Sequence, residues 1–233
     1  MRAILFDVFG TVVDWRSSLI AQFQALSAEL GRELPGEMLA DQWRGHYAPS
    51  MDRVRTGELP WTILDDLHRT SLGALLAQHG LDLDAALVER INRFWHRLEP
   101  WPDAVNGLHR LKERFVIGTL TNGNLALMVD VARHAGLPWD VLFCADLFQH
   151  YKPDPQVYLG ACRLLGLPPS EVMLCAAHNY DLRAARALGF RTAFIPRPTE
   201  YGPAQCKDLD AEEDWDLIAG DLEDLGRRLV TAL

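Results

Sequence analysis

The sequence predicts an α/β protein in which an α-helical cap domain is inserted into a parallel-sheet core after the first strand. Three observations support this prediction. A short apolar run opens the chain at residues 3–7, a long segment with helical periodicity follows it, and apolar runs alternate with helix-like segments beyond Pro100. Alternating strands and helices are typical of a parallel sheet covered by helices on both faces.

The first expected strand ends in a carboxylate. Its apolar residues run from Ala3 to Phe6 and are followed directly by Asp7. Gly10 then allows the backbone to turn sharply. Taken alone, Asp7 could equally brace this turn. A candidate site residue therefore occurs within the first ten positions.

The segment from Ser17 to about Leu98 has helical periodicity, and we expect no strand within it. Gly31 is placed to end its first helix, and Pro35 and Pro60 interrupt the remainder of the segment. The other strands come after this segment, so it is expected to be an insertion beside the end of the first strand. The apolar residues of its first helix are Leu19, Ile20, Phe23, Leu26 and Leu30.

Four further strands are expected after Pro100 and Pro102. Ligands of open α/β sheets bind at the carboxyl ends of the strands. Asp7, Thr121, Lys152 and Asp181 would all project there, beneath the inserted helices. The apolar runs are Val116 to Leu120, Val141 to Cys144, Val172 to Cys175 and Thr192 to Ile195.

The composition limits the classes of partner and location. The formal charge of −9 argues against nucleic acid and anionic membranes as partners, because both require a basic face. It is compatible with a small anionic substrate. The apolar runs are far shorter than the ~20 residues of a membrane span, and the first residues lack the layout of a secretory signal. We therefore expect a cytoplasmic protein. Four cysteines without metal-ligand spacing are expected to be free thiols: Cys144, Cys162, Cys175 and Cys206.

Four motifs follow the expected strands in order and together identify a family. They are Phe6-Asp7-Val8-Phe9-Gly10-Thr11, Thr121-Asn122-Gly123, Tyr151-Lys152-Pro153-Asp154-Pro155 and Ala176-Ala177-His178-Asn179-Tyr180-Asp181. With these motifs, nearly the whole chain resembles the haloacid dehalogenase superfamily. The resemblance implies a Rossmann-like core domain at residues 1–15 and 100–233 and an α-helical cap domain at residues 16–99.

Two positions separate the phosphatases of this superfamily from its dehalogenases. The phosphatases have a second aspartate two residues after the nucleophile, where this chain has Phe9, and an acidic Mg²⁺ ligand where it has Ala176. An aromatic residue at position 9 is similar to the type II L-2-haloacid dehalogenases, which need no metal. The resemblance thus implies no metal and no cofactor, and it places Phe9 among the substrate-binding residues.

The chemistry of dehalogenation explains this difference. Asp7 would attack the halogen-bearing carbon from the rear, and halide leaves without being protonated. Water would then open the resulting ester at the carboxyl carbon of Asp7. The product would be a 2-hydroxy acid of inverted configuration.

The resemblance assigns roles to other residues, each with a structural alternative. Lys152 would keep Asp7 ionised and oriented, and Thr11 would hydrogen-bond the Asp7 carboxylate or only shape the turn. Thr121 and Asn122 match a Ser-Asn pair that binds the substrate carboxylate, with a helix-start role as the alternative.

Two further assignments are more open. Arg44 matches the arginine that abstracts halide, although Arg53, Arg55 and Arg69 also lie in the cap segment. Tyr158 matches a site tyrosine, but it could equally be an ordinary residue of an amphipathic helix.

The last motif departs from the family pattern Ser-Ser-Asn-Ala-Trp-Asp. Asp181 matches its final aspartate and is expected to position or activate the hydrolytic water, with helix capping as the alternative. His178 takes the asparagine position and is expected to bond the substrate, contact Asp181 or act as a base. Asn179 is assigned to substrate binding.

The expected function is therefore metal-independent hydrolytic dehalogenation of short 2-haloalkanoic acids. Two alternatives remain open: a Mg²⁺-dependent phosphatase, and a catalytically silent protein that binds a small anion. A homodimer is common among the proteins that the chain resembles.

Overall fold

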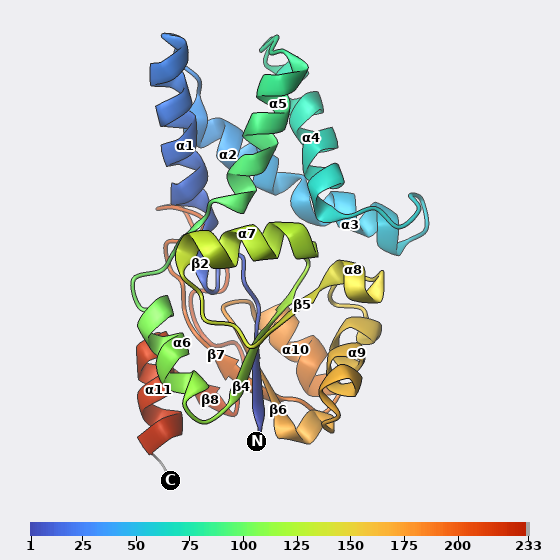
Figure 1. Cartoon of the computed structure of the whole chain (residues 1–233), viewed down its shortest axis with the longest axis vertical. Helices are drawn as coiled ribbons and strands as arrows, with labels where there is room; N and C mark the ends of the chain where they lie inside the picture. The colour runs from blue at the N-terminus through green and yellow to red at the C-terminus, as the bar shows by residue number, and fades with distance from the viewer. Residues whose placement is uncertain (232–233) are drawn as a thin grey trace.

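The computed structural model describes residues 1–231, in which a parallel sheet lies below a group of helices (Figure 1). This confirms the predicted α/β class. The sheet has six strands in the order β5 (Val141–Cys144), β4 (Val116–Thr121), β1 (Ala3–Phe6), β6 (Val172–Ala176), β7 (Arg191–Phe194) and β8 (Leu217–Ile218). The short strand β8 carries too few residues to give a periodic signal and was not predicted.

The side chains of β1 alternate between two apolar clusters, one on each face of the sheet. Ile4 and Phe6 belong to one cluster, and Ala3 and Leu5 to the other. This period of two is the geometry of a strand buried on both faces. The first cluster includes residues of α6 (Ala104–Lys112), α7 (Leu125–Ala135) and α11 (Leu222–Thr231), and the second includes residues of α9 (Pro155–Leu165) and α10 (Asn179–Ala187). Short helices α8 (Ala145–Phe148) and η2 (Pro169–Glu171) complete the connections.

The inserted segment is helical, and a pair of short strands marks where it leaves and rejoins the sheet. Strand β2 (Val13–Asp14) pairs antiparallel with β3 (Glu99–Pro100). The first helix ends at Gly31, whose φ of 59° is left-handed, as its predicted stop requires. The helices are α1 (Trp15–Leu30), α2 (Gly36–Gly45), α3 (Tyr47–Arg55), α4 (Leu64–Gln78), α5 (Ala85–Asn92) and η1 (Arg93–His96).

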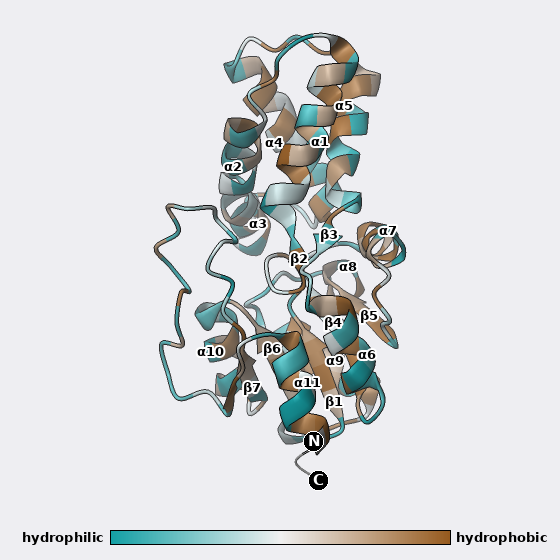
Figure 2. Cartoon of the chain, turned by 90° about the vertical axis from the view of Figure 1, so that its left-hand side faces the viewer, coloured by the Kyte–Doolittle hydropathy of each residue, from teal (hydrophilic) through white to brown (hydrophobic). Residues whose placement is uncertain are grey.

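A view turned by 90° shows the same arrangement, with the inserted helices above the sheet and both termini at its far end (Figure 2). The carboxyl ends of the strands therefore face the inserted helices. Within residues 1–231, no helix combines the length and hydrophobicity that a bilayer crossing requires.

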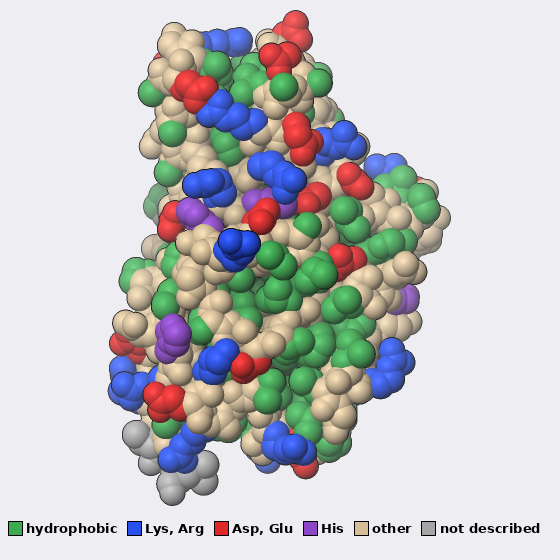
Figure 3. Space-filling view, viewed as in Figure 1, with side chains coloured by type: hydrophobic (Ala, Val, Ile, Leu, Met, Phe, Trp, Pro, Cys, Tyr) green, Lys and Arg blue, Asp and Glu red, His purple; other side chains and the backbone are tan. Residues whose placement is uncertain are grey.

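Acidic and basic side chains are interspersed over the inserted helices on the face shown in Figure 3. Among the ion pairs of these helices, Arg90 pairs with Glu29, and Arg93 lies 3.5 Å from Asp130 of α7. Side chains of one charge sign therefore do not form a single large patch on the inserted helices of this face.

Candidate active site

Asp7 lies directly after β1, at the sheet edge that faces the inserted helices, and is 6% exposed. Both of its carboxylate oxygens are held. Lys152 Nζ lies 2.8 Å from Oδ1, whereas Thr11 Oγ1 donates to Oδ2 at 2.7 Å and His178 Nδ1 lies 3.0 Å from the same oxygen. Gly10, with φ of 87°, makes the turn that brings Thr11 back to Asp7.

Lys152 joins Asp7 to a second buried carboxylate. Its Nζ contacts Asp181 as well as Asp7, and Tyr158 donates its hydroxyl to Asp181 Oδ1 at 2.5 Å. The Lys152 backbone N–H donates to Asn122 Oδ1 at 2.7 Å, which ties the motif after β5 to the motif after β4. Four residues from separate motifs thus form one connected buried network.

Burial and the charges within this network determine the protonation states of Asp7 and Asp181. Burial alone would raise the pKa of Asp7, but the Lys152 ammonium and His178 outweigh it and hold that pKa well below its ordinary value. Burial and the neighbouring Asp7 charge together raise the pKa of Asp181 despite its contact with Lys152. Asp7 is therefore ionised at neutral pH, and Asp181 is the stronger proton acceptor of the two.

His178 lies between Asp7 and a residue that the sequence motifs did not indicate. Its Nε2 is 2.9 Å from Oε2 of Glu200, which is 1% exposed. Trp15 Nε1 also donates to Glu200, at 3.0 Å. The structure thus places His178 against Asp7 and Glu200; the expected contact with Asp181 is not formed.

Arg44 is held between two aromatic rings of the inserted segment. Its guanidinium carbon lies 4.0 Å from the centre of the Tyr47 ring and 5.2 Å from that of Trp15, and Nη2 is 3.9 Å from Glu200. Its buried Nη1 forms no hydrogen bond with residues 1–231. Arg53 and Arg69, by contrast, are mostly exposed.

A cavity of about 670 Å³ lies between the inserted helices and the sheet edge. Four predicted site residues line it, namely Arg44, Asn122, Lys152 and His178, and Asp7 lies directly behind the last two. Tyr180 of the last motif lines the cavity as well, together with cations and aromatic residues outside the motifs: Trp15, Tyr47, Arg55, Tyr201 and Lys207.

Two predicted substrate-binding residues face other partners. The Thr121 hydroxyl accepts a hydrogen bond from the Gly123 N–H at 3.1 Å, so it shapes the turn while Asn122 reaches the cavity. The side-chain amide of Asn179 hydrogen-bonds to the segment after β7. Its Nδ2 donates to Asp208 at 2.9 Å, and its Oδ1 accepts from Trp215 at 3.0 Å. The Asn179 side chain thus secures that segment, and Asn179 is not among the residues that line the cavity.

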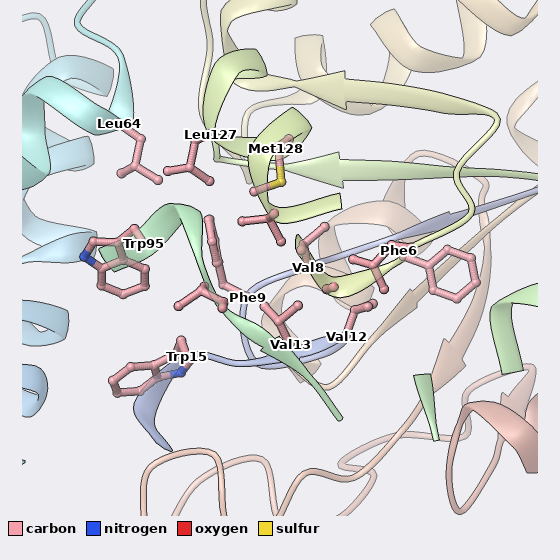
Figure 4. Close-up of a cluster of buried hydrophobic side chains, with 14 of the residues drawn as sticks. Phe6, Val8, Phe9, Val12, Val13, Trp15, Leu64, Trp95, Leu127 and Met128 are labelled. Atoms are coloured by element: carbon pink, nitrogen blue, oxygen red, sulfur yellow. The ribbon is translucent and has the colours of Figure 1, made fainter. Parts of the chain in front are cut away.

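Phe9 and Tyr158, which were also predicted to bind substrate, do not line the cavity and contact other residues instead. Phe9 is 2% exposed and packs edge-on against Trp95, in an apolar cluster that includes Leu64 of α4 and Leu127 of α7 (Figure 4). It joins the inserted helices to the core. Tyr158 is fully buried behind Asp181 and acts on the site through that carboxylate.

The described part of the chain contains no group of three or more His, Cys, Asp or Glu side chains arranged to hold a metal ion. At the two positions where the phosphatases carry acidic residues, Phe9 and Ala176 are buried among apolar side chains. Three of the cysteines are buried free thiols and Cys206 is an exposed one.

Comparison with known protein families gives a match over residues 1–189 to the haloacid dehalogenase-like hydrolases. The chain is 28% identical to (S)-2-haloacid dehalogenase 4A of Burkholderia cepacia, over 94% of this chain and 95% of that protein. It is 30% identical to (S)-2-haloacid dehalogenase 1 of Pseudomonas sp. strain CBS-3, over 86% and 88%.

Crystal structures of two similar proteins superpose over almost the full length. One is an L-2-haloacid dehalogenase, 70% identical, with a TM-score of 0.98 over 99% of both chains. The other is a defluorinating L-2-haloacid dehalogenase, 46% identical, with a TM-score of 0.96 over 98% of this chain and 95% of the other.

Proposed function

The chain belongs to the haloacid dehalogenase-like hydrolases, and we propose that it removes halide from short 2-haloalkanoic acids through an ester formed on Asp7. One observation carries this proposal. Asp7 is buried and ionised against Lys152 directly behind a cavity that Arg44 lines. The names of its relatives, which are 2-haloacid dehalogenases, support the same substrate class.

Oδ1 is the better placed nucleophilic atom of Asp7. An ionised carboxylate has about two acceptor positions on each oxygen. Those of Oδ2 are taken by Thr11 and His178, whereas among residues 1–231 Oδ1 accepts only from Lys152. Oδ1 therefore keeps a lone pair for attack on the halogen-bearing carbon.

Cationic and amide donors around the cavity suit a haloacid. The buried Nη1 of Arg44 has no partner in residues 1–231, so it can bind the halide as negative charge develops. Asn122 lines the same cavity and can contact the substrate carboxylate. Lys207 also lines the cavity and favours an anionic substrate over a neutral one, whereas Arg55 is paired with Asp52 and Asp154.

The ester is then opened by water at the carboxyl carbon of Asp7. Asp181 can accept the proton of this water, because burial raises its pKa above the ordinary value of a carboxyl group. Its contacts with Lys152 and Tyr158 keep it oriented. The proton returns to Oδ1 as the bond between that oxygen and the carboxyl carbon breaks, and the 2-hydroxy acid leaves.

The donor set around Asp7 supports a reaction without Mg²⁺. The ammonium of Lys152 already neutralises Asp7, and the side chains of Phe9 and Ala176 carry no oxygen that could bind the metal. The same two positions disfavour the phosphatase alternative, which needs a second acid near the nucleophile.

The test is halide release from chloroacetate and (S)-2-chloropropionate in the presence of EDTA. We expect release to be unaffected by EDTA, to yield (R)-lactate from the second substrate, and to be abolished in Asp7→Asn. Mass spectrometry of enzyme quenched during turnover should find the adduct on the peptide that contains Asp7.

Other outcomes would favour the alternatives. Phosphate release from p-nitrophenyl phosphate that increases with Mg²⁺ would indicate a phosphatase. Binding of a short carboxylate without halide release from any haloacid would indicate a silent anion-binding protein. Fluoroacetate belongs in the same panel, because the 46% identical relative is a defluorinating enzyme.

Location and assembly stay predictions. We propose a cytoplasmic enzyme, which the buried free thiols at three cysteine positions support. A homodimer is testable by light scattering.

A further inference from the structure

His178 is held between two carboxylates, one on each ring nitrogen. Nδ1 lies 3.0 Å from Oδ2 of Asp7 and Nε2 lies 2.9 Å from Oε2 of Glu200, and the residue is 3% exposed. Ionised carboxylates only accept hydrogen bonds, so both ring nitrogens must carry a hydrogen. The geometry therefore requires an imidazolium, which has no lone pair with which to take a proton from water.

Several neighbours hold the Glu200 carboxylate in place. Trp15 Nε1 donates to its Oε1 at 3.0 Å, and its carboxylate packs over Gly10 so closely that a Cβ added to Gly10 would lie 2.1 Å from Oε1. Arg44 Nη2, at 3.9 Å, adds a second cation. A carboxylate fixed on four sides, counting His178, is suited to holding a ring in one orientation and one charge state.

The other nitrogen of His178 converges with Thr11 on a single oxygen of Asp7. Thr11 Oγ1 accepts from the Ala177 N–H at 2.9 Å, which directs its own hydrogen toward Oδ2. With Oδ1 as the nucleophile, Oδ2 becomes the carbonyl oxygen of the ester. Two preorganised donors therefore meet the atom on which negative charge develops during hydrolysis.

We propose that the His178 imidazolium, held by Glu200, forms with the Thr11 hydroxyl an oxyanion hole for Oδ2 of Asp7 during ester hydrolysis. Water adds to the carboxyl carbon, the electrons of the C=O bond move onto Oδ2, and the bond to Oδ1 breaks as the C=O bond reforms. The histidine proton is never transferred. Glu200 is a positioning residue, and this assignment rests on the proposed ester mechanism.

Of the titratable groups in and around this site, His178 is the one whose change of charge should appear in the pH profile of hydrolysis. Burial alone would lower the pKa of His178, but Glu200 and Asp7 outweigh it and raise that pKa well above its ordinary value. His178 and Arg44 lower the pKa of Glu200 against the effect of burial, and the acidic neighbours of Lys152 raise that of its ammonium. Burial and the charges of Asp181 and Asp7 raise the pKa of Tyr180, whose ring is 5.9 Å away, well above its ordinary value. The facing titratable and charged groups are Asp7, Arg44, Lys152, Tyr180, Asp181 and Glu200.

The test separates the two chemical steps in Glu200→Gln. Halide released in the first turnover reports ester formation, and steady-state turnover reports hydrolysis. We expect a burst of about one equivalent at near wild-type rate, followed by turnover slowed about 100-fold at pH 8, the usual effect of losing an oxyanion-hole donor. The ester on Asp7 should accumulate in mass spectra.

The pH dependence distinguishes this role from general-base catalysis. Without the Glu200 charge the pKa of His178 falls, so the ring loses its proton as pH rises, and hydrolysis should slow between pH 6 and 9. A histidine base would show the opposite trend, because the neutral ring is then the active form. Turnover of Glu200→Gln that increases with pH would overturn the proposal.

Two further variants distinguish a specific effect of Glu200→Gln on His178 from a general folding defect. His178→Ala should also accumulate the ester, and the double variant His178→Ala/Glu200→Gln should be no slower than His178→Ala, because Glu200 acts through His178. Glu212→Gln, an exposed carboxylate paired with Arg183, is the matched control and should behave as wild type. Additive losses in the double variant would overturn the assignment. Wild-type protein that releases no halide would instead refute the proposed function itself.

Discussion

Lys152 Nζ lies 2.8 Å from Oδ1 of Asp7, and the two side chains are 1% and 9% exposed. A buried ion pair is a weak contribution to stability, but removal of one partner leaves the other charge uncompensated. The pair is therefore best understood through what it does to Asp7, whose pKa burial would otherwise raise.

In Lys152→Met the rate of ester formation should depend on pH, whereas in the wild type it should not. In the wild type the pKa of Asp7 is lowered, so its charged form persists from pH 9 down to pH 5 and the halide burst should not change over that range. Without the ammonium, His178 alone is left to oppose burial, so the pKa of Asp7 rises and a larger share of the nucleophile is protonated at low pH. We expect a burst about 10-fold slower at pH 6 that recovers as pH rises.

Lys112→Met is the matched control for this variant. Lys112 is partly exposed and pairs with Asp140 at 2.7 Å, far from the cavity in sequence and absent from its lining. It should leave the burst unchanged. A Lys152→Met burst with wild-type rate and pH profile would show that Lys152 is only structural.

Arg44→Lys should impair the first step although the charge is kept. The guanidinium lies over Tyr47 at 4.0 Å and near Trp15 at 5.2 Å, and a lysine ammonium cannot reproduce this planar stacking with a free donor. We expect halide release about 10 to 100-fold slower, with the larger loss for fluoroacetate, whose leaving group depends most on donors. Arg53→Lys, on the exposed part of α3, should have no effect.

Much of the site could be predicted because strand ends carry its chemistry. Asp7, Asn122 and Lys152 each follow an apolar run within a recognisable motif, and the parallel topology brings such positions together. Local signals, namely periodicity and motif spacing, were sufficient for these residues.

Glu200 and Asn179 show where such signals fail. Glu200 follows two prolines in the irregular segment after β7, and only its burial against His178 reveals a role. The partners of Asn179, Asp208 and Trp215, lie in the same aperiodic region, so sequence periodicity could not indicate these contacts. The domain boundaries at residues 15 and 99 stay predictions.

Gly10→Ala should damage both folding and hydrolysis. The φ of Gly10 is 87°, which L side chains rarely adopt, and its new Cβ would lie 2.1 Å from Oε1 of Glu200. We expect destabilisation of about 2 to 4 kcal/mol in urea unfolding and slower ester hydrolysis in the folded fraction. Gly73→Ala in α4, where nothing lies within 4 Å, should instead stabilise by about 0.5 to 1 kcal/mol. Equal effects of the two substitutions would contradict this account.

His96 connects the inserted helices to the core and should make stability depend on pH. Its Nδ1 lies 2.8 Å from Asp130 of α7 and its Nε2 lies 3.0 Å from Asp65 of α4, so both nitrogens face carboxylates. Burial lowers the pKa of His96, but Asp65 and Asp130 outweigh it and raise that pKa, despite the nearby charge of Arg93.

The sign of this dependence is set by the raised pKa. The contribution of His96 is fully present below the ordinary histidine pKa of about 6.5 and is lost as pH rises through the higher value of the folded state. His96→Gln removes it at every pH. The Tm of the wild type should therefore exceed that of the variant by several degrees at pH 6, since 1 kcal/mol corresponds to about 2 to 4 °C in a chain of this size. The difference in Tm should narrow toward pH 9, because His96 loses its proton as the pH rises. Contributions from other groups, such as His178, are the same in both proteins and cancel in the comparison. A Tm difference that stays constant from pH 6 to 9 would mean that the imidazolium does not couple the two parts of the chain.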